Sequence, residues 1–163
     1  MSRRRTPPPG HRPPGEHRTR RERAYARRVL QRRAVIDYAL ARRATLAELA
    51  RGGVSRREVC DAHPDLLRAA RFHGETTTKR CPLCRSDRPL SHVTYVYGDE
   101  LGESSGRTRA HSELVALSQH HADLRVFVVE VCQGCSWNHL VSSFGIGTGE
   151  AVRRPARRRA AGK

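Results

Sequence analysis

Two pairs of cysteines have the types and spacing of a metal site. The stretch "CPLC" contains Cys81 and Cys84, and "CQGC" repeats the spacing with Cys132 and Cys135. Each CxxC turn can direct two sulfurs toward one centre, and two such turns complete a tetrahedral zinc site with Zn–S bonds of about 2.3 Å. Four thiolates leave no coordination position for a catalytic water. The pattern therefore predicts one structural zinc ion held by these four cysteines.

Other uses of the cysteines are less favoured. A redox dithiol needs one exposed CxxC at a helix N-terminus, whereas this chain has two CxxC pairs without that context. Cys60 lies on a predicted short helix among apolar residues, and we expect it to be a small core residue rather than a fifth ligand. The N-terminus lacks the apolar run of a signal peptide, and no stretch reaches transmembrane length. We expect a cytoplasmic protein, in which thiols stay reduced.

The two cysteine pairs adjoin predicted strands. Residues 90–98 alternate between two faces, 124–132 are rich in β-branched residues, and 136–145 have the composition of a further strand. CxxC turns at the ends of antiparallel strands predict a zinc ribbon built on a three-stranded antiparallel sheet. The 47 residues between the pairs exceed a minimal ribbon. Residues 98–123 are therefore predicted to be an insertion, a glycine-rich loop followed by a helix.

The segment before the first cysteine pair is predicted to be helical. Residues 19–43 have helix-forming composition without a break, and we expect the packed part of the chain to begin near Ala34. The next helix is predicted to start at Thr45 as N-cap, with Glu48 three residues later, and to stop at Gly52. This helix is predicted to be the first of a cluster of short helices.

Two more short helices follow from their end signals. Ser55 with Glu58 has the spacing of a second capping box, and Pro64 can occupy the first turn of a helix that ends at Gly74. The apolar side chains expected to be buried by this last helix are Leu66, Leu67, Ala70 and Phe72.

The predicted fold class is α+β, an N-terminal cluster of short helices followed by a zinc ribbon. Residues 1–18 mix proline, glycine and arginine, a composition that favours an extended tail. The expected units are a basic Pro/Arg-rich tail at 1–33 that is partly helical from about 19, a helical subdomain at 34–75, a zinc-ribbon subdomain at 76–149 and a basic disordered tail at 150–163.

The positive charge is concentrated at the two ends of the chain. The formal net charge is +16; residues 1–33 hold 12 Arg and two Glu, and residues 151–163 hold five Arg, one Lys and no acid. The residues between them hold 14 basic and 14 acidic side chains. Arginine-rich segments of this kind contact polyanions such as nucleic acid.

The favoured function is a non-catalytic zinc-ribbon adaptor. Its expected partner is nucleic acid, RNA in preference to DNA, or a nucleoprotein machine such as the ribosome or the transcription machinery; neither a membrane nor a small-molecule substrate is expected. Trp137, Tyr95, Tyr97 and Phe144 offer stacking surfaces, too few to indicate sequence-specific single-strand recognition. The expected nucleic-acid contacts are Arg3, Arg4, Arg5, Arg20, Arg21, Arg153, Arg154, Arg157, Arg158 and Arg159.

Two alternatives remain open. Residues 45–73 could form a helix-turn-helix that reads DNA, with Arg56 and Arg57 opening the second helix. Asp61 and Asp65 follow directly and count against phosphate contact. The other alternative is a zinc-supported nuclease, whose candidate histidines are His120, His121 and His139; catalysis would need a second metal beside the ribbon.

The central part of the chain resembles a known family. Residues 34–149, with "VCDAHPDLLRAARFHGE", "CPLC" and "VCQGCSWNHL", are similar to a family of short actinobacterial proteins of unknown function. The resemblance implies an actinobacterial zinc-ribbon protein and implies no activity. On that resemblance the ligand positions are Cys81, Cys84, Cys132 and Cys135.

Overall fold

The fold is built on one six-stranded sheet. The computed structural model describes residues 30–149, and its sheet has the strand order β1-β6-β5-β3-β2, with β4 paired to β3. All pairings are antiparallel. The α+β class is confirmed, but the sheet has six strands where three were expected. The strands are β1 (Arg33–Asp37), β2 (Glu75–Arg80), β3 (Pro89–Tyr97), β4 (Arg107–Thr108), β5 (Leu124–Val131) and β6 (Asn138–Ile146).

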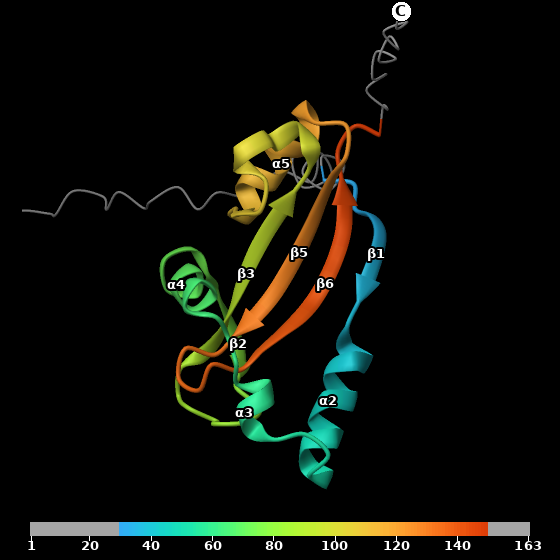
Figure 1. Ribbon diagram of the computed structural model, residues 1–163. Coiled ribbons are helices and arrows are strands. Elements are labelled where there is room, and N and C mark those ends of the chain that lie inside the picture. The colour runs from blue at the N-terminus through green and yellow to red at the C-terminus, as the bar shows by residue number, and fades with distance from the viewer. Residues whose placement is uncertain (1–29, 150–163) are drawn as a thin grey trace, which may run out of the picture.

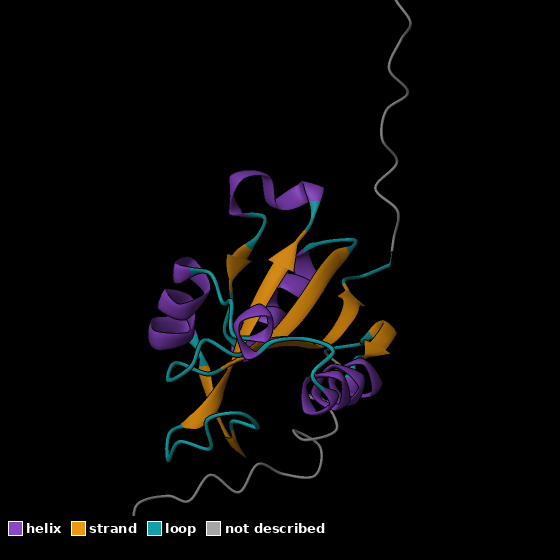
Figure 2. Cartoon of the chain, turned by 60° about the horizontal axis from the view of Figure 1, so that its bottom comes forward, coloured by secondary structure: helices purple, strands orange, loops and turns teal. Residues whose placement is uncertain are grey.

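The helices lie around this sheet on more than one side, as Figure 2 shows. Three α-helices precede β2, and a 3₁₀ turn and one α-helix occupy the connection between β3 and β5. This connection is the predicted insertion, and its helix is confirmed. The helices are α2 (Ala39–Arg51), α3 (Arg56–Val59), α4 (Pro64–His73), the 3₁₀ turn η1 (Asp99–Ser104) and α5 (His111–His120).

Strand β1 corrects the helix predicted for residues 19–43. In the part of that segment that the structure describes, Arg33–Asp37 forms an edge strand that pairs with β6, and Ala34 adopts a left-handed φ of 46° at a bulge in the pairing. Val35 and Ile36 are β-branched residues that suit a strand once a partner is present. The composition alone could not reveal that partner, because β6 lies about 100 residues later in the chain.

Helix ends follow the predicted signals except at α2. This helix begins at Ala39, and Thr45 lies inside it, where its hydroxyl donates to the carbonyl of Ala41 (3.1 Å) instead of capping. The predicted stop is confirmed, because Gly52 ends α2 with a left-handed φ of 77°. The capping box of Ser55 and Glu58 is confirmed in α3.

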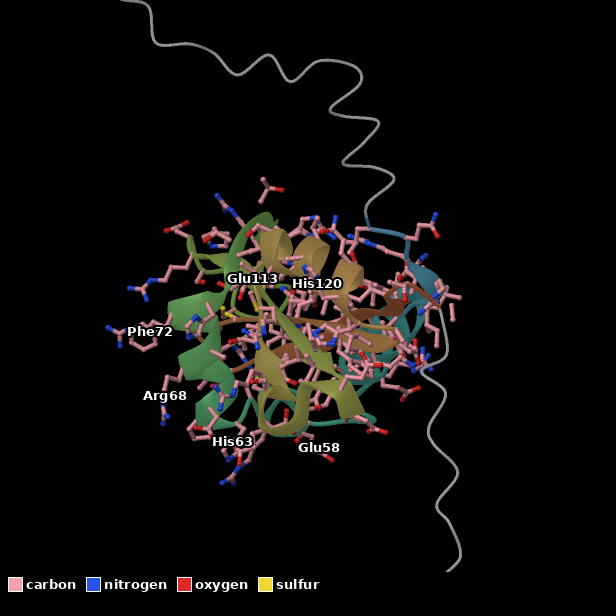
Figure 3. The ribbon with its side chains drawn as sticks, turned by 90° about the horizontal axis from the view of Figure 1, so that it is seen from above. Glu58, His63, Arg68, Phe72, Glu113 and His120 are labelled. Atoms are coloured by element: carbon pink, nitrogen blue, oxygen red, sulfur yellow. The ribbon has the colours of Figure 1, made fainter. Side chains whose placement is uncertain are left out.

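The two faces of the sheet bury different helices. On one face Val96, Val126 and Phe144 pack with Leu114 of α5. On the other, Val93 and Val131 pack with Ala70 of α4, with the partly buried Leu66 and Leu67 beside them. The prediction for Phe72 was wrong: its side chain is 67% exposed and points away from the sheet, as Figure 3 shows.

The two ends of the sheet carry different parts of the chain. The β2–β3 and β5–β6 turns, which carry the cysteine pairs, lie together at the lower end in Figure 1, and β1 begins and β6 ends at the upper end. Arg33 pairs with Gly145 at that upper end, so the chain enters and leaves the described fold side by side. Strand β1 comes from the segment predicted to be helical, and it pairs with a strand of the predicted ribbon.

Candidate metal centre

Two hairpin turns carry the four cysteines to one place. Cys81 and Cys84 lie in the turn between β2 and β3, and Cys132 and Cys135 lie in the turn between β5 and β6. Strands β3 and β5 pair directly, with Ser91 opposite Val131, so the two turns are neighbours at one end of the sheet. The long connection between the pairs does not separate them, because it leaves and re-enters the sheet at the opposite end.

The two CxxC turns, called the first and second knuckle, have the same backbone geometry. The N–H of Arg85 donates to the carbonyl of Cys81 (3.2 Å), and the N–H of Ser136 donates to that of Cys132 (3.0 Å). Arg85 and Ser136 both adopt left-handed φ angles, 50° and 62°. In the second knuckle the left-handed residue is Ser136 rather than Gly134. The amide of Gly134 donates to the Cys132 sulfur.

The four sulfurs are close enough to share one metal ion. All four lie within 4.8 Å of one another, with Sγ–Sγ separations of 3.6 Å between Cys81 and Cys135 and 3.5 Å between Cys84 and Cys132. A tetrahedral zinc site with bonds of about 2.3 Å has sulfurs about 3.8 Å apart. None of these cysteines forms a disulfide with a residue of the described chain. The cluster could therefore hold a metal ion such as zinc, at the positions that the sequence predicted.

The thiols have different acidities. Burial raises the pKa of Cys132 and of Cys135, because an uncompensated thiolate is unfavourable away from water. A hydrogen bond from the backbone N–H of Ser86 lowers the pKa of Cys84 to about 6. A divalent cation would supply the positive charge that the buried sulfurs lack. Cys84 is thus the ligand best prepared to meet the metal as a thiolate.

Arg56 connects the centre to helix α3. Its guanidinium is hydrogen-bonded to Cys60 and to Cys135, and these contacts raise the pKa of Arg56. Cys60 packs beside Cys81 and Cys132 in the third core cluster but is not one of the four clustered sulfurs. This position in the core agrees with the prediction that Cys60 is a packing residue. The contact from Arg56 was not predicted, and no spacing signal in the sequence marks it.

A buried polar group lies directly behind the second knuckle. Glu130 is 2% exposed, and its Oε1 accepts hydrogen bonds from Trp137 Nε1 (2.9 Å) and from Arg42 Nε (2.5 Å). Trp137 also stacks on the ring of His139, with centroids 5.9 Å apart. This arrangement gives the "WNHL" segment a structural role that sequence reasoning missed, and it fastens α2 to the sheet beside the cysteines.

The histidines proposed for a nuclease do not assemble. His139 lies near the start of β6, beside Trp137, whereas the carbonyl of His121 accepts from Thr148, just beyond the other end of β6. The ring of His121 contacts Glu100 (3.2 Å), and His120 lies exposed at the end of α5 in Figure 3. Within residues 30–149 the only cluster able to hold a metal is the four-cysteine group.

The segment proposed as a helix-turn-helix lacks a recognition helix. Helix α3, which Arg56 and Arg57 open, has four residues, too short to lie along a major groove. The exposed Arg56 lies beside Cys60 and Cys135. All ten arginines predicted to contact nucleic acid lie outside the described residues. Among residues 30–149, no helix has both the length and the apolar character needed to cross a bilayer.

Comparison with known proteins places the chain in a family. The model of DUF5318, a family of unknown function, matches residues 29–161. The uncharacterized proteins Rv0049 of Mycobacterium tuberculosis and Mb0050 of Mycobacterium bovis are each 47% identical to the chain over 120 residues, 74% of this chain and 87% of the relative. No solved structure matches it. The expected resemblance to actinobacterial proteins is confirmed, and the chain belongs to the family DUF5318.

Proposed function

We propose that this protein is a non-catalytic adaptor built around one structural zinc ion. The observation that carries this proposal is the set of four sulfurs within 4.8 Å of one another at the joined ends of two hairpins. Four thiolates saturate zinc, so the metal would have no position for a substrate or an activated water. Its contribution would be to hold the two knuckles together at the end of the sheet.

We propose further that the arginine-rich terminal segments contact nucleic acid, either free or within a nucleoprotein machine. Their charge supports this partner, because residues 1–33 and 151–163 carry the entire net charge of +16. We favour RNA over duplex DNA, because α3 is too short to serve as the recognition helix of a helix-turn-helix.

The metal part of the proposal is tested by elemental analysis of the full chain purified under reducing conditions. We expect one zinc per chain, and Cys132→Ser should lose the metal and the cooperative unfolding transition. The matched control is Cys60→Ser, which changes a neighbouring thiol outside the four and should keep the zinc. A reduced, folded sample without zinc, or a Cys60→Ser variant that loses it, would contradict the four-cysteine assignment.

The partner part is tested by binding of the full chain to labelled RNA at several salt concentrations. Affinity should fall steeply as salt rises, because each phosphate contact releases counterions. Replacing Arg3, Arg4, Arg5, Arg153 and Arg154 by glutamine should weaken binding and flatten that dependence. A chain that binds no nucleic acid at low salt would sink this part of the proposal and leave the zinc assignment intact.

A further inference from the structure

Within residues 30–149, one region of the sheet carries aromatic side chains that are only partly buried. In an antiparallel sheet, residues directly opposite each other point to the same face. Tyr95 of β3 lies opposite Phe127 of β5, and Tyr97 lies opposite Arg125. These four residues, called the aromatic face, are on the same side of the sheet as Val93, where α4 packs. Helix α4 packs on the rows nearer the knuckles, and Tyr95 lies partly buried against that cluster, whereas Tyr97 and Phe127 do not belong to it.

The burial of the two sides of these strands is unequal. On the side of α5, Val96, Val126 and Phe144 are almost completely buried. On the aromatic face Tyr97 is 46% exposed, Phe127 and Tyr95 are half-buried, and Arg125 is exposed. The solvent-exposed face of an antiparallel sheet is normally polar. Partly exposed aromatic rings on the two central strands therefore indicate a surface that binds a partner.

The rings are held in place rather than loosely attached. Tyr97 and Phe127 meet edge to face, with ring centroids 5.5 Å apart and planes at 85°. Gly106, the residue before β4, also lies against Tyr97, and a Cβ there would come within 3.1 Å of the ring atom Cε1. A fixed ring loses little conformational entropy when a flat ligand group stacks on it.

The cation of the aromatic face, Arg125, suits contact with an anionic group. Within residues 30–149 no carboxylate forms an ion pair with Arg125, which lies directly opposite Tyr97. Asp65 is the carboxylate near Tyr95, and it is already paired with Arg68 (3.3 Å) and contacts His63 (3.4 Å). Arg125 is thus an exposed cation in the row of Tyr97, at an end of the sheet whose nearby carboxylates include Asp123, paired with Arg33, and Glu100, paired with His121.

The chain also brings its two arginine-rich segments to this end. Arg125 lies opposite Gly145, and Gly145 in turn lies opposite Arg33, three residues after the start of the described chain. The described chain ends at Gly149, close to the guanidinium of Arg33. The segments that contain most of the net positive charge therefore connect to the fold beside the row of Tyr97 and Arg125.

We propose that the aromatic face is a stacking platform for single-stranded nucleic acid, with Tyr97 and Phe127 contacting bases and Arg125 contacting phosphate. The inference rests on the proposed function and names where the bases bind. Aromatic side chains on a sheet stack on unpaired bases of any sequence, whereas a duplex keeps its bases paired inside.

The test uses the full chain and a labelled single-stranded RNA of about 12 nucleotides, with its duplex as a second probe. Tyr97→Ala should weaken single-strand binding roughly tenfold or more, with a smaller effect on the duplex, and Tyr97→Phe should restore it. Phe72→Ala is the matched control, because Phe72 is a more exposed aromatic residue that points away from the sheet. Arg125→Gln should reduce the salt dependence by about one counterion.

The outcomes separate this inference from the proposed function. If Tyr97→Ala binds like the unaltered chain while neutralising the terminal arginines abolishes binding, the platform is wrong and the proposed function stands. If the unaltered chain binds no nucleic acid, both are wrong. If Tyr97→Ala instead converts a dimer into a monomer by light scattering, a second copy covers the face and the platform is again wrong. Thermal unfolding and zinc content of each variant verify that the fold is intact, and ultraviolet crosslinking should attach nucleotides to the peptides containing Tyr97 or Phe127.

Discussion

The indole N–H of Trp137 donates a 2.9 Å hydrogen bond to the carboxylate of Glu130, and both side chains are almost completely buried. The same oxygen of Glu130 accepts from Arg42 of α2, so one carboxylate joins the second knuckle, strand β5 and the first helix. A buried charge is tolerated only when it is paired and hydrogen-bonded. Loss of this contact should therefore destabilise the fold around the cysteines.

Removing the carboxylate should destabilise the protein strongly. Glu130→Ala leaves the buried indole N–H and the guanidinium of Arg42 without their partner, so we expect a loss of about 3 kcal/mol or more in the free energy of unfolding. Urea unfolding followed by the fluorescence of Trp137 measures it. Glu48→Ala, which removes an exposed carboxylate paired with Arg51, is the control and should cost about 0.5 kcal/mol or less. Equal losses in the two variants would contradict a special role for Glu130.

Arg56 and Arg57 are adjacent arginines with different predicted effects on the metal. The guanidinium of Arg56 is hydrogen-bonded to Cys60 and Cys135, whereas no such contact involves Arg57 in the described chain. Residues that hydrogen-bond to metal ligands commonly contribute a factor of ten or more to metal affinity. Arg56→Ala should therefore raise the dissociation constant for zinc about tenfold in a chelator competition, and Arg57→Ala should leave it unchanged. Unchanged zinc affinity in Arg56→Ala would show that the contact is incidental.

His92 should make stability depend on pH near neutrality. Burial lowers the pKa of His92 in the folded protein, and its Nε2 is buried without a hydrogen-bond partner in the described structure. The unfolded chain therefore takes up a proton near pH 6.5 that the folded chain does not, and stability should fall as pH drops below that value. His92→Leu should flatten the dependence of the unfolding free energy between pH 7.5 and about 5.5.

The control for that measurement is His120→Gln, which alters an exposed histidine at the end of α5. Loss of zinc in acid would act equally on both variants, so the difference between their pH profiles isolates His92. Identical profiles would show that the environment of His92 does not oppose its charge.

Removing the terminal segments should leave the fold intact as long as residues 30–149 are kept. Among residues 30–149 the structure has three core clusters, and Leu30, the first described residue, packs against one of them. Deleting residues 1–29 and 150–163 should change the melting temperature by only a few degrees. Deleting 1–37 instead removes Leu30 and strand β1, exposes the edge of β6, and should lower it much further. A large loss on the shorter deletion would show that the removed segments pack on the fold.

The amino-acid sequence by itself determined the metal site and the elements that carry it. Ligand chemistry and the CxxC spacing are local, so all four cysteines could be identified before the fold was known. The strands β3, β5 and β6 were also predictable, because alternation along β3 and the strand-like composition of β5 and β6 are local features of each segment. The stops at Gly52 and Gly74 and the capping box at Ser55 are likewise short-range signals that depend on a few adjacent residues.

Only the tertiary structure decided the features that depend on partners distant in the chain. Strand β1 exists because β6 offers it an edge, and its five residues have no strand signal strong enough to outweigh a helical composition. The burial of Glu130 is decided by Arg42 and Trp137, which approach it from other elements. The exposure of Tyr97 and the burial of Phe144 depend on which face of the sheet α5 covers. Alternation along a strand assigns residues to two faces, and long-range packing alone determines which face meets the helix and which meets the solvent.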